Sequence, residues 1–567
     1  MENPDRVTYF AATDARGKRV PFGIKAKDRS KHMYVIGKTG MGKSTMLENM
    51  AIQDIRNGEG MAFIDPHGSA VDKLLDFIPE DRVKDVVYFA PFDLENPIAF
   101  NVMEDVGYDK RHLVVSGLMA TFKKIWVDAW SARMEYILTN TLLALLEYPG
   151  ATLLGVNRMY TDKNYRKKVV ENIKDPVVKD FWVSEFANYG DRYTQEATPA
   201  IQNKIGQFTS NPLIRNIIGQ PHSSFDIRDL MDNRKILLVN LSKGLVGDTN
   251  MQLLGSMLTT RIFLGAMSRA DLPSHELAKT PSFYFYVDEF QNFANESFSE
   301  ILSEARKYQL SLIIAHQYVA QMEEEVQAAV FGNVGSTVSF RVGPLDAELL
   351  EKVFMPKFLQ EDLVNLGFTQ IYLSLMIDGV GSQPFSAVTI PGIEPPPRSY
   401  RLEVLENSRQ QFATKRAGIE NAILTELSQA AEEAAMNHKA ASAGPANKKP
   451  GMGAPRREDR PAPRVEASRR EERPAPRPER VERPAPPQAA KTADDLKAIL
   501  RATVANVEKN KQKKQGGKQE SLKDALRTTI GNVPQAPVPP APKSPAQEPK
   551  PVFEVPEETL RSLFKDV

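Results

Sequence analysis

Residues 33–45 read MYVIGKTGMGKST, four apolar residues followed by a glycine-rich loop. Residues 37–44 fit the pattern Gly-x-x-x-x-Gly-Lys-Ser, which joins a buried strand to a helix. Glycines in such a loop let backbone N–H groups surround a phosphate, and the start of the following helix contributes the positive end of its dipole. These residues therefore predict a phosphate-binding loop in an α/β domain.

Each position of this loop has an expected role in binding a nucleoside triphosphate with Mg²⁺. We expect Lys43 to contact the β and γ phosphates, Ser44 to place its hydroxyl on Mg²⁺, and Thr45 to lie near the α phosphate. The expected nucleotide-binding residues are Gly37, Lys38, Thr39, Gly40, Met41, Gly42, Lys43, Ser44 and Thr45.

A second apolar run ends in two adjacent carboxylates, in the sequence FYFYVDE at residues 283–289. Asp288, at the strand end, can hold a water of the Mg²⁺ shell, and Glu289 can orient and deprotonate the water that attacks the γ phosphate. An ordinary acidic turn after a buried strand is the alternative. Together with the phosphate loop, the pair favours nucleotide hydrolysis.

Polar residues also follow two further apolar runs. After residues 310–315 come His316 and Gln317, and we expect Gln317 to sense the γ phosphate, unless it is only a surface residue. After residues 61–64, Asp65 and His67 face either the nucleotide or a translocated substrate, because strand carboxyl ends border the ligand crevice of open α/β sheets. The alternative for Asp65 is a cap on the following helix.

Two arginines are candidates for a finger that stabilises charge on the γ phosphate of a neighbouring subunit. They are Arg306, in SEARKYQ, and Arg341, in VSFRVG. Ordinary surface salt bridges are the alternative for both.

The alternation of apolar runs with helical patterns between residues 33 and 390 predicts a mainly parallel sheet covered on both faces. The expected strands are residues 33–36, 61–64, 86–89, 236–239, 283–287, 310–315, 338–342 and 371–376. Between about residues 110 and 216 this signal gives way to helical periodicity, for example an apolar stripe from Met134 to Leu145. The predicted domains are 1–109 and 226–400 for the two parts of the ATPase domain, 110–225 for an all-α insertion, 401–440 for a closing helix (helical pattern 409–435), and 441–567 for a tail.

Composition separates the tail from the body. Residues 445–567 contain 20 of the 40 prolines, two aromatic residues, and 26 Lys and Arg against 17 Asp and Glu, a net charge of +9. Residues 1–444 carry 47 basic and 55 acidic residues, a net charge of −8. Such a tail cannot bury a core, so we expect it to be disordered, and the acidic body argues against a protein that coats nucleic acid. The absence of cysteine excludes disulfides, thiolate metal sites and a cysteine nucleophile.

The tail contains a short internal repeat. Residues 495–507 (DLKAILRATVANV) match residues 521–533 (SLKDALRTTIGNV) at seven of 13 positions, with Leu, Leu and Val on one helical face of each copy. Residues 558–567 resemble a weaker third copy. These segments are interpreted as docking peptides for a partner, the alternative being an incidental pattern in a low-complexity tail.

Taken in order, the motifs resemble the ATPase domain of type IV secretion coupling proteins of the TraD/TraG type, in the HerA/FtsK clan. The resemblance covers about residues 8–395 and rests on MYVIGKTGMGKST, GMAFIDPHG, ILLVNLSKG, FYVDEFQNF, LSEARKYQLSLIIAHQY, GSTVSFRVG and PFSAVTI. It implies a hexameric ring of RecA-like P-loop NTPase domains with an all-α insertion, using ATP and Mg²⁺ to pass DNA through the pore. It places the carboxylates for Mg²⁺ and for the attacking water on Asp288 and Glu289 and the sensor on Gln317, and it assigns no arginine finger.

The chain departs from this family in one respect that bears on its location. Coupling proteins usually begin with transmembrane helices, whereas no run here reaches about 18 uninterrupted apolar residues. We therefore expect a cytoplasmic protein without a membrane span, either recruited to the inner face of the membrane through its tail or acting free. Two alternatives to a DNA translocase stay open: an assembly ATPase acting on protein partners, and a nucleotide-gated scaffold.

Overall fold

The computed structural model describes residues 3–14, 18–189, 191–294, 298–319, 322–426 and 428. The tail 441–567, with its repeats at 495–507, 521–533 and 558–567, lies outside the described residues, so its predicted disorder and docking role stay predictions. Within the described residues, no helix is both long and apolar enough to cross a membrane.

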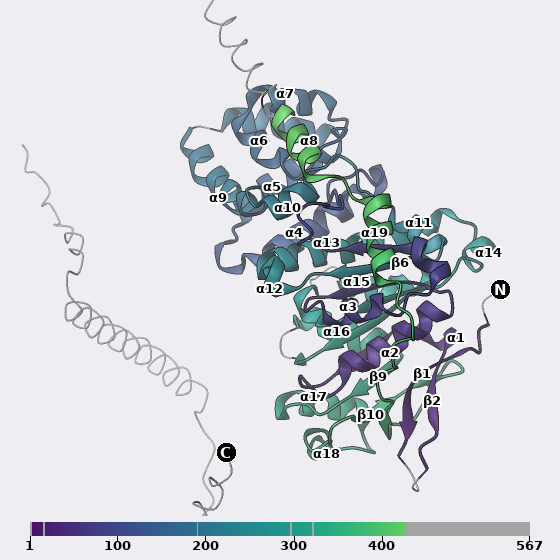
Figure 1. Cartoon of the computed structure of the whole chain (residues 1–567). Helices are drawn as coiled ribbons and strands as arrows, with labels where there is room; N and C mark the ends of the chain where they lie inside the picture. Colours follow the sequence, from purple (N-terminus) through teal and green to yellow (C-terminus); the bar gives the residue numbers. More distant parts are fainter. Residues whose placement is uncertain are drawn as a thin grey trace, which may run out of the picture. The chain divides into compact units, whose positions relative to one another are not determined.

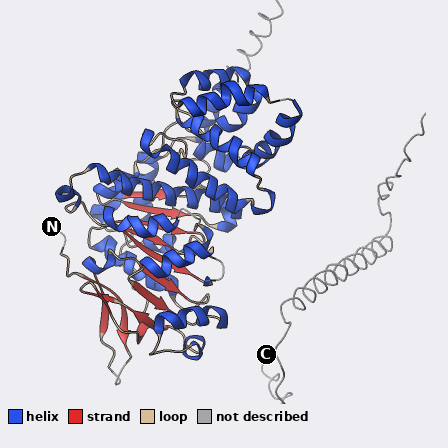
Figure 2. Cartoon of the chain, turned by 180° about the vertical axis from the view of Figure 1, so that it is seen from behind, coloured by secondary structure: helices blue, strands red, loops and turns tan. Residues whose placement is uncertain are grey.

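Eleven strands of the described chain form one sheet, in the order β2-β1-β13-β10-β9-β3-β8-β7-β4-β6-β5 (Figures 1 and 2). The last seven run parallel: β9 (Ser336–Ser339), β3 (Met33–Ile36), β8 (Leu310–His316), β7 (Phe283–Val287), β4 (Gly60–Asp65), β6 (Ile236–Asn240) and β5 (Val86–Phe89). Nearly all of their residues are buried, as continuous apolar runs require. The predicted mainly parallel α/β sheet is confirmed.

The other four strands extend the sheet in antiparallel fashion. They are β10 (Gln370–Ser374), β13 (Phe385–Thr389), β1 (Val7–Thr13) and β2 (Pro21–Lys25). The prediction that residues 371–376 form a parallel strand is wrong, because β10 pairs antiparallel with both its neighbours. Its burial alternates along the strand, which is the pattern of a strand covered mainly on one face.

Helices cover both faces of the parallel part (Figure 2). The side chains of β3 take part in the cores on both faces. Met33 and Val35 belong to the core beneath α2 (Lys43–Arg56) and α3 (Ser69–Leu75), whereas Tyr34 and Ile36 belong to the core on the opposite face. Successive side chains of a strand point to opposite faces, so one four-residue strand joins two cores. The opposite face is covered mainly by α13 (Asp248–Met267), α15 (Phe298–Glu304) and α16 (Glu324–Asn333).

A helical segment separates β5 from β6 and lies above the sheet in Figure 1. It comprises α4 (Arg111–Ile125), α5 (Ala132–Leu146), α6 (Gly155–Thr161), α7 (Lys163–Asn172), α8 (Pro176–Asp180), α9 (Asp191–Thr209) and α10 (Pro212–Ile218). The apolar stripe predicted on residues 134–145 is the buried face of α5. The first helix, α4, packs on α13 so closely that a Cβ on Gly117 would lie 2.6 Å from the Thr260 side chain.

The end of the body differs from the single helix expected over residues 409–435. Helix α19 (Arg401–Phe412) starts earlier and ends where Ala413 forms a β-bridge with Ile98, and residues 416–426 are helical again. The hydroxyl of Ser408 accepts a hydrogen bond from the backbone N–H of Tyr88 at 2.9 Å, so α19 lies along the edge strand β5. Pairing with the 95–98 segment interrupts the helix, which periodicity alone does not reveal.

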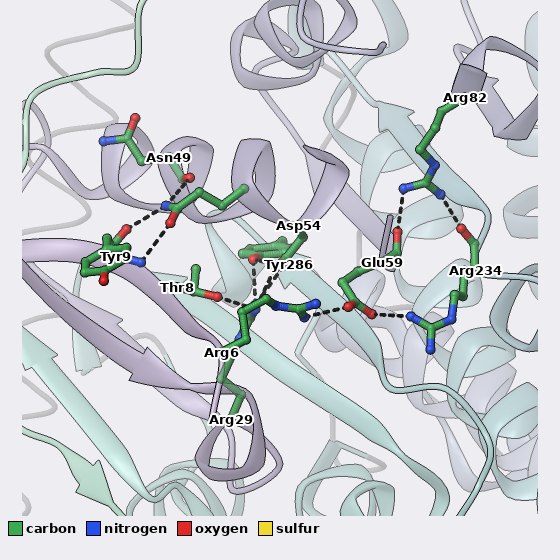
Figure 3. A network of polar contacts seen from close by, with 11 residues as sticks. Arg6, Thr8, Tyr9, Arg29, Asn49, Asp54, Glu59, Arg82, Arg234 and Tyr286 are labelled. Atoms are coloured by element: carbon green, nitrogen blue, oxygen red, sulfur yellow. Dashed lines mark hydrogen bonds and ion pairs between the residues drawn. The ribbon is translucent and has the colours of Figure 1, made fainter. Parts of the chain in front are cut away.

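A polar network fastens β1 to the parallel sheet (Figure 3). Buried Arg29 forms two hydrogen bonds with Asp54 of α2, at 2.6 and 2.8 Å, and a third with the Tyr286 hydroxyl on β7 at 2.7 Å. Beside it, Arg6 pairs with Glu59 at 2.5 Å. Arg29 also donates to the hydroxyl of Thr8 on β1 at 3.1 Å, so the network ties β1 to α2 and β7. Buried ions need such paired partners to offset their loss of hydration.

Candidate active site

The phosphate loop connects β3 to α2, as its sequence predicts. Gly40 and Gly42 have φ of 77° and 111°, values that glycine adopts without the steric cost other residues meet. The backbone N–H of Gly37 donates to the carbonyl of His316 at 3.2 Å, and that of Lys38 donates to the carbonyl of Arg341 at 2.8 Å. The loop is therefore held between the ends of β8 and β9, at the carboxyl edge of the parallel sheet.

Lys43 is buried and folded back onto this loop. Its Nζ donates to the carbonyl of Gly37 at 2.6 Å. Burial lowers the pKa of Lys43 below its usual value, while the nearby carboxylates of Glu289 and Asp288 act in the opposite direction.

Ser44 and Asp288 meet as the Mg²⁺ prediction requires. The Ser44 hydroxyl donates to Asp288 Oδ2 at 2.8 Å, and Asp288 is only 2% exposed. Burial raises the pKa of Asp288 to about 6; the Ser44 hydrogen bond acts against this, and the charges of Glu289 and Asp65 add to it. A hydroxyl and a carboxylate are hard oxygen donors of the kind Mg²⁺ prefers, so these residues fit that ion.

Glu289 has both carboxylate oxygens held by amide groups. Oε1 accepts from Gln317 Nε2 at 2.6 Å, and Oε2 accepts from Gln291 Nε2 at 2.6 Å. Its backbone lies in the left-handed region, with φ of 48°, a strained conformation that occurs often at functional sites. The structure thus brings Gln317 to Glu289, while its expected role as a sensor of the γ phosphate stays a prediction. It adds Gln291, which the sequence analysis missed although it lies only two residues after Glu289.

His316, just before Gln317, is buried beneath the site. Its Nδ1 lies 3.2 Å from the Tyr34 hydroxyl. Burial, with smaller effects of the charges on Lys43 and Lys124, lowers the pKa of His316 to about 3. The imidazole is therefore neutral at physiological pH.

Of the two interpretations of Asp65, the structure supports a cap on the following helix. Its carboxylate accepts from the backbone N–H groups of His67 at 2.7 Å and of Ala70, in the first turn of α3, at 2.8 Å. His67 is exposed and lines a cavity of about 470 Å³ together with residues of β5, β6 and α19. Asp65 still lies near enough to influence the pKa of Asp288.

The two candidate fingers lie at opposite ends of the sheet. Arg341 lies two residues after β9, and its backbone carbonyl accepts a hydrogen bond from Lys38 of the phosphate loop. Arg306 is exposed on a 3₁₀ turn (Ala305–Tyr308) that precedes β8, so it lies at the strand end opposite to Gln317. Only Arg341 is brought to the site of its own chain.

Residues 18–352 match the family model described as the type IV secretion-system coupling protein DNA-binding domain. No curated protein matches the chain.

Solved structures with similarity to the chain include two of the plasmid coupling protein TrwB. The complex with the non-hydrolysable GTP analogue GDPNP is 15% identical with a TM-score of 0.48, covering 69% of this chain and 90% of TrwB. The complex with ADP and Mg²⁺ is 14% identical with a TM-score of 0.49, covering 71% and 99%. VirB4 of Thermoanaerobacter pseudethanolicus is 14% identical with a TM-score of 0.44, covering 71% and 99%.

The family match spans more than half of the chain, from before the phosphate loop to beyond the Asp288–Glu289 pair and Gln317. The chain therefore belongs to the type IV secretion-system coupling protein family.

Proposed function

We propose that this protein is an ATP-hydrolysing, ring-forming DNA translocase that acts in type IV secretion. The observation that carries the proposal is the doubly held carboxylate of Glu289, beside buried Lys43 and the Ser44–Asp288 pair. The description of the matching family names DNA binding, and TrwB has been solved with ADP and Mg²⁺ and with an ATP analogue.

The residues divide the work of hydrolysis among them. The phosphate loop, residues 37–45, orients the triphosphate, and Lys43 leaves the carbonyl of Gly37 to contact the β and γ phosphates. Mg²⁺ bound at Ser44 and Asp288 would neutralise phosphate charge. Glu289 accepts a proton from the attacking water, while the amides of Gln317 and Gln291 keep its carboxylate aimed at that water.

A finger from a neighbouring subunit completes the proposed ring, for which a hexamer is the family's expectation. Arg341 borders its own phosphate loop, whereas exposed Arg306 lies where only another subunit's nucleotide could meet it. Substituting each arginine by alanine and mixing it with Glu289→Gln subunits distinguishes the two. If the arginine acts in trans, the mixture regains activity. Some interfaces then pair the intact Glu289 of one subunit with the intact arginine of its neighbour.

The proposed substrate is tested by measuring steady-state ATP hydrolysis without DNA, with single-stranded DNA and with duplex DNA. A translocase is expected to hydrolyse ATP several-fold faster with the DNA form that it moves. Hydrolysis that depends on Glu289 but ignores both forms of DNA would favour an assembly ATPase acting on protein. A chain that binds ATP without turnover would instead be a nucleotide-gated scaffold.

A further inference from the structure

Lys124 belongs to the helical insertion but contacts the loop that follows the catalytic carboxylates. It lies in the last turn of α4, and its Nζ donates to the carbonyl of Gln291 at 2.7 Å and to the carbonyl of Ala294. Lys124 is only partly exposed, and this burial lowers its pKa to about 8. Burying a lysine ammonium costs hydration free energy, which an exposed lysine keeps. The two carbonyl contacts of Lys124 therefore call for a functional explanation.

The same loop carries the side chain that holds Glu289. Gln291 accepts the Lys124 hydrogen bond through its backbone carbonyl and donates through its side chain to Glu289 Oε2 at 2.6 Å. Two hydrogen bonds therefore separate the tip of α4 from the carboxylate assigned to the attacking water. The other oxygen of Glu289 is held by Gln317, which directly follows β8.

The far side of the loop is held by α13. A Cβ on Gly255 would lie 2.2 Å from the Phe293 ring, so that ring packs directly on the helix backbone. The Ser256 hydroxyl also donates to the carbonyl of Phe293 at 3.3 Å. Residues 290–294 therefore contact α13 of the ATPase domain on one side and Lys124 of α4, in the insertion, on the other. The two helices also pack closely on each other.

We propose that Lys124 is a positioning residue for Glu289, through which the helical insertion sets the rate of ATP hydrolysis. This inference rests on the proposed function, since it assigns Glu289 to the attacking water. A shift of α4 relative to α13 moves the carbonyl of Gln291 and, with it, the amide that orients the carboxylate. Misplacing a reacting group by about 1 Å can reduce the rate about a hundredfold, so a small movement is enough for control.

The test replaces Lys124 by methionine, which keeps the length of the side chain and removes its donors. Lys123→Met is the matched control, because Lys123 is exposed on the same helix. We expect Lys124→Met to lower kcat about tenfold, while KM and the affinity for a fluorescent ATP analogue with Mg²⁺ change less than about twofold. Lys124→Arg, which restores the donors, is expected to recover part of kcat.

A double-mutant cycle with Gln291→Ala shows whether Lys124 acts through that residue. If it does, kcat of the double variant equals kcat of Gln291→Ala alone. If the two residues act independently, the two reductions in kcat multiply. Multiplying effects, or an unchanged kcat in Lys124→Met, would overturn the proposal. A rise in KM with unchanged kcat would also overturn it, since that pattern belongs to nucleotide binding.

Hydrogen exchange separates failure of this proposal from failure of the proposed function. The amides of residues 290–294 are expected to exchange faster in Lys124→Met than in Lys123→Met, with or without turnover. If Glu289→Gln hydrolyses ATP normally, the role of Glu289 fails although the exchange difference remains. If exchange is equal in the two lysine variants, the tether itself is absent and the inference fails.

Discussion

The two amides on Glu289 show how single side chains prepare a carboxylate to act as a base. A free carboxylate rotates about its last torsion angle, whereas hydrogen bonds to both oxygens restrict it to one orientation. Gln317→Ala removes one of these bonds, the 2.6 Å contact to Oε1. We expect kcat to fall about tenfold or more with nucleotide affinity nearly unchanged. Gln360→Ala, at an exposed position of α18 (Gln360–Val364), serves as control; equal activity of the two variants would refute the assigned role.

Two buried histidines give the protein a sensitivity to acid. Burial lowers the pKa of His32 to about 4 and of His316 to about 3, from 6.5 for each in the unfolded chain. Because the unfolded chain binds these protons more readily, the free energy of unfolding is highest above pH 6.5. It falls as the pH drops toward the folded-state pKa values of about 4 and 3. At pH 5 the loss is about 2 kcal/mol for each, from the free energy of protonating the unfolded chain. Asp288, with a raised pKa, changes in the opposite direction by about 1 kcal/mol, so the net change is destabilising.

Urea denaturation of the nucleotide-free protein at pH 7 and pH 5 measures this effect. We expect a lower midpoint at pH 5, and a smaller difference between the two pH values in His32→Gln, which retains an acceptor for the backbone N–H of Leu312. The same pH dependence in wild type and variant would show that His32 is not held neutral in the folded protein.

At the scale of elements, the phosphate loop contains one glycine that is required by close packing, Gly37, and one that is required only by its backbone conformation, Gly40. A Cβ on Gly37 would lie 2.5 Å from the Cβ of Phe340, whereas a Cβ on Gly40 would meet no atom within 4 Å. Gly37→Ala must therefore displace the residues after β9, at a cost of about 1–3 kcal/mol. Gly40→Ala incurs only the cost of its left-handed backbone, about 1 kcal/mol. Thermal unfolding without nucleotide is expected to show the larger loss for Gly37→Ala, and the reverse order would refute the packing argument.

The same scale shows what a sequence can reveal about this fold. The elements β3, α2 and β7 are predictable because a continuous apolar run and a motif coincide within a few residues. The antiparallel direction of β10 is not, because strand direction depends on which partner lies beside it. Gln291 and Lys124 were missed for a related reason: their importance comes from contacts with Glu289 and with a loop 167 residues away in sequence. Asp65 is a residue that the sequence did identify, but with two possible roles, of which capping was one.

At the scale of the whole molecule, an acidic body is joined to a basic tail. If the tail contributes to DNA affinity, its net charge of +9 acts through neutralised phosphates and released counterions. Removing residues 441–567 is expected to weaken DNA binding at low salt and to reduce the slope of log affinity against log salt concentration. ATP hydrolysis without DNA is expected to stay unchanged, because the described site lies within residues 33–341. An identical salt slope for both proteins would place DNA binding entirely in the body.

The central claim is that Glu289 activates the attacking water in an ATP-hydrolysing site. Single-turnover hydrolysis of Mg²⁺–ATP by wild type, Glu289→Gln and the control Glu300→Gln, an exposed position on α15, tests it most directly. We expect Glu289→Gln to bind ATP with nearly wild-type affinity and to hydrolyse it at least a hundredfold more slowly, about the contribution of a general base. We expect Glu300→Gln to match wild type. Hydrolysis by Glu289→Gln at the wild-type rate, with ATP bound, would contradict the account.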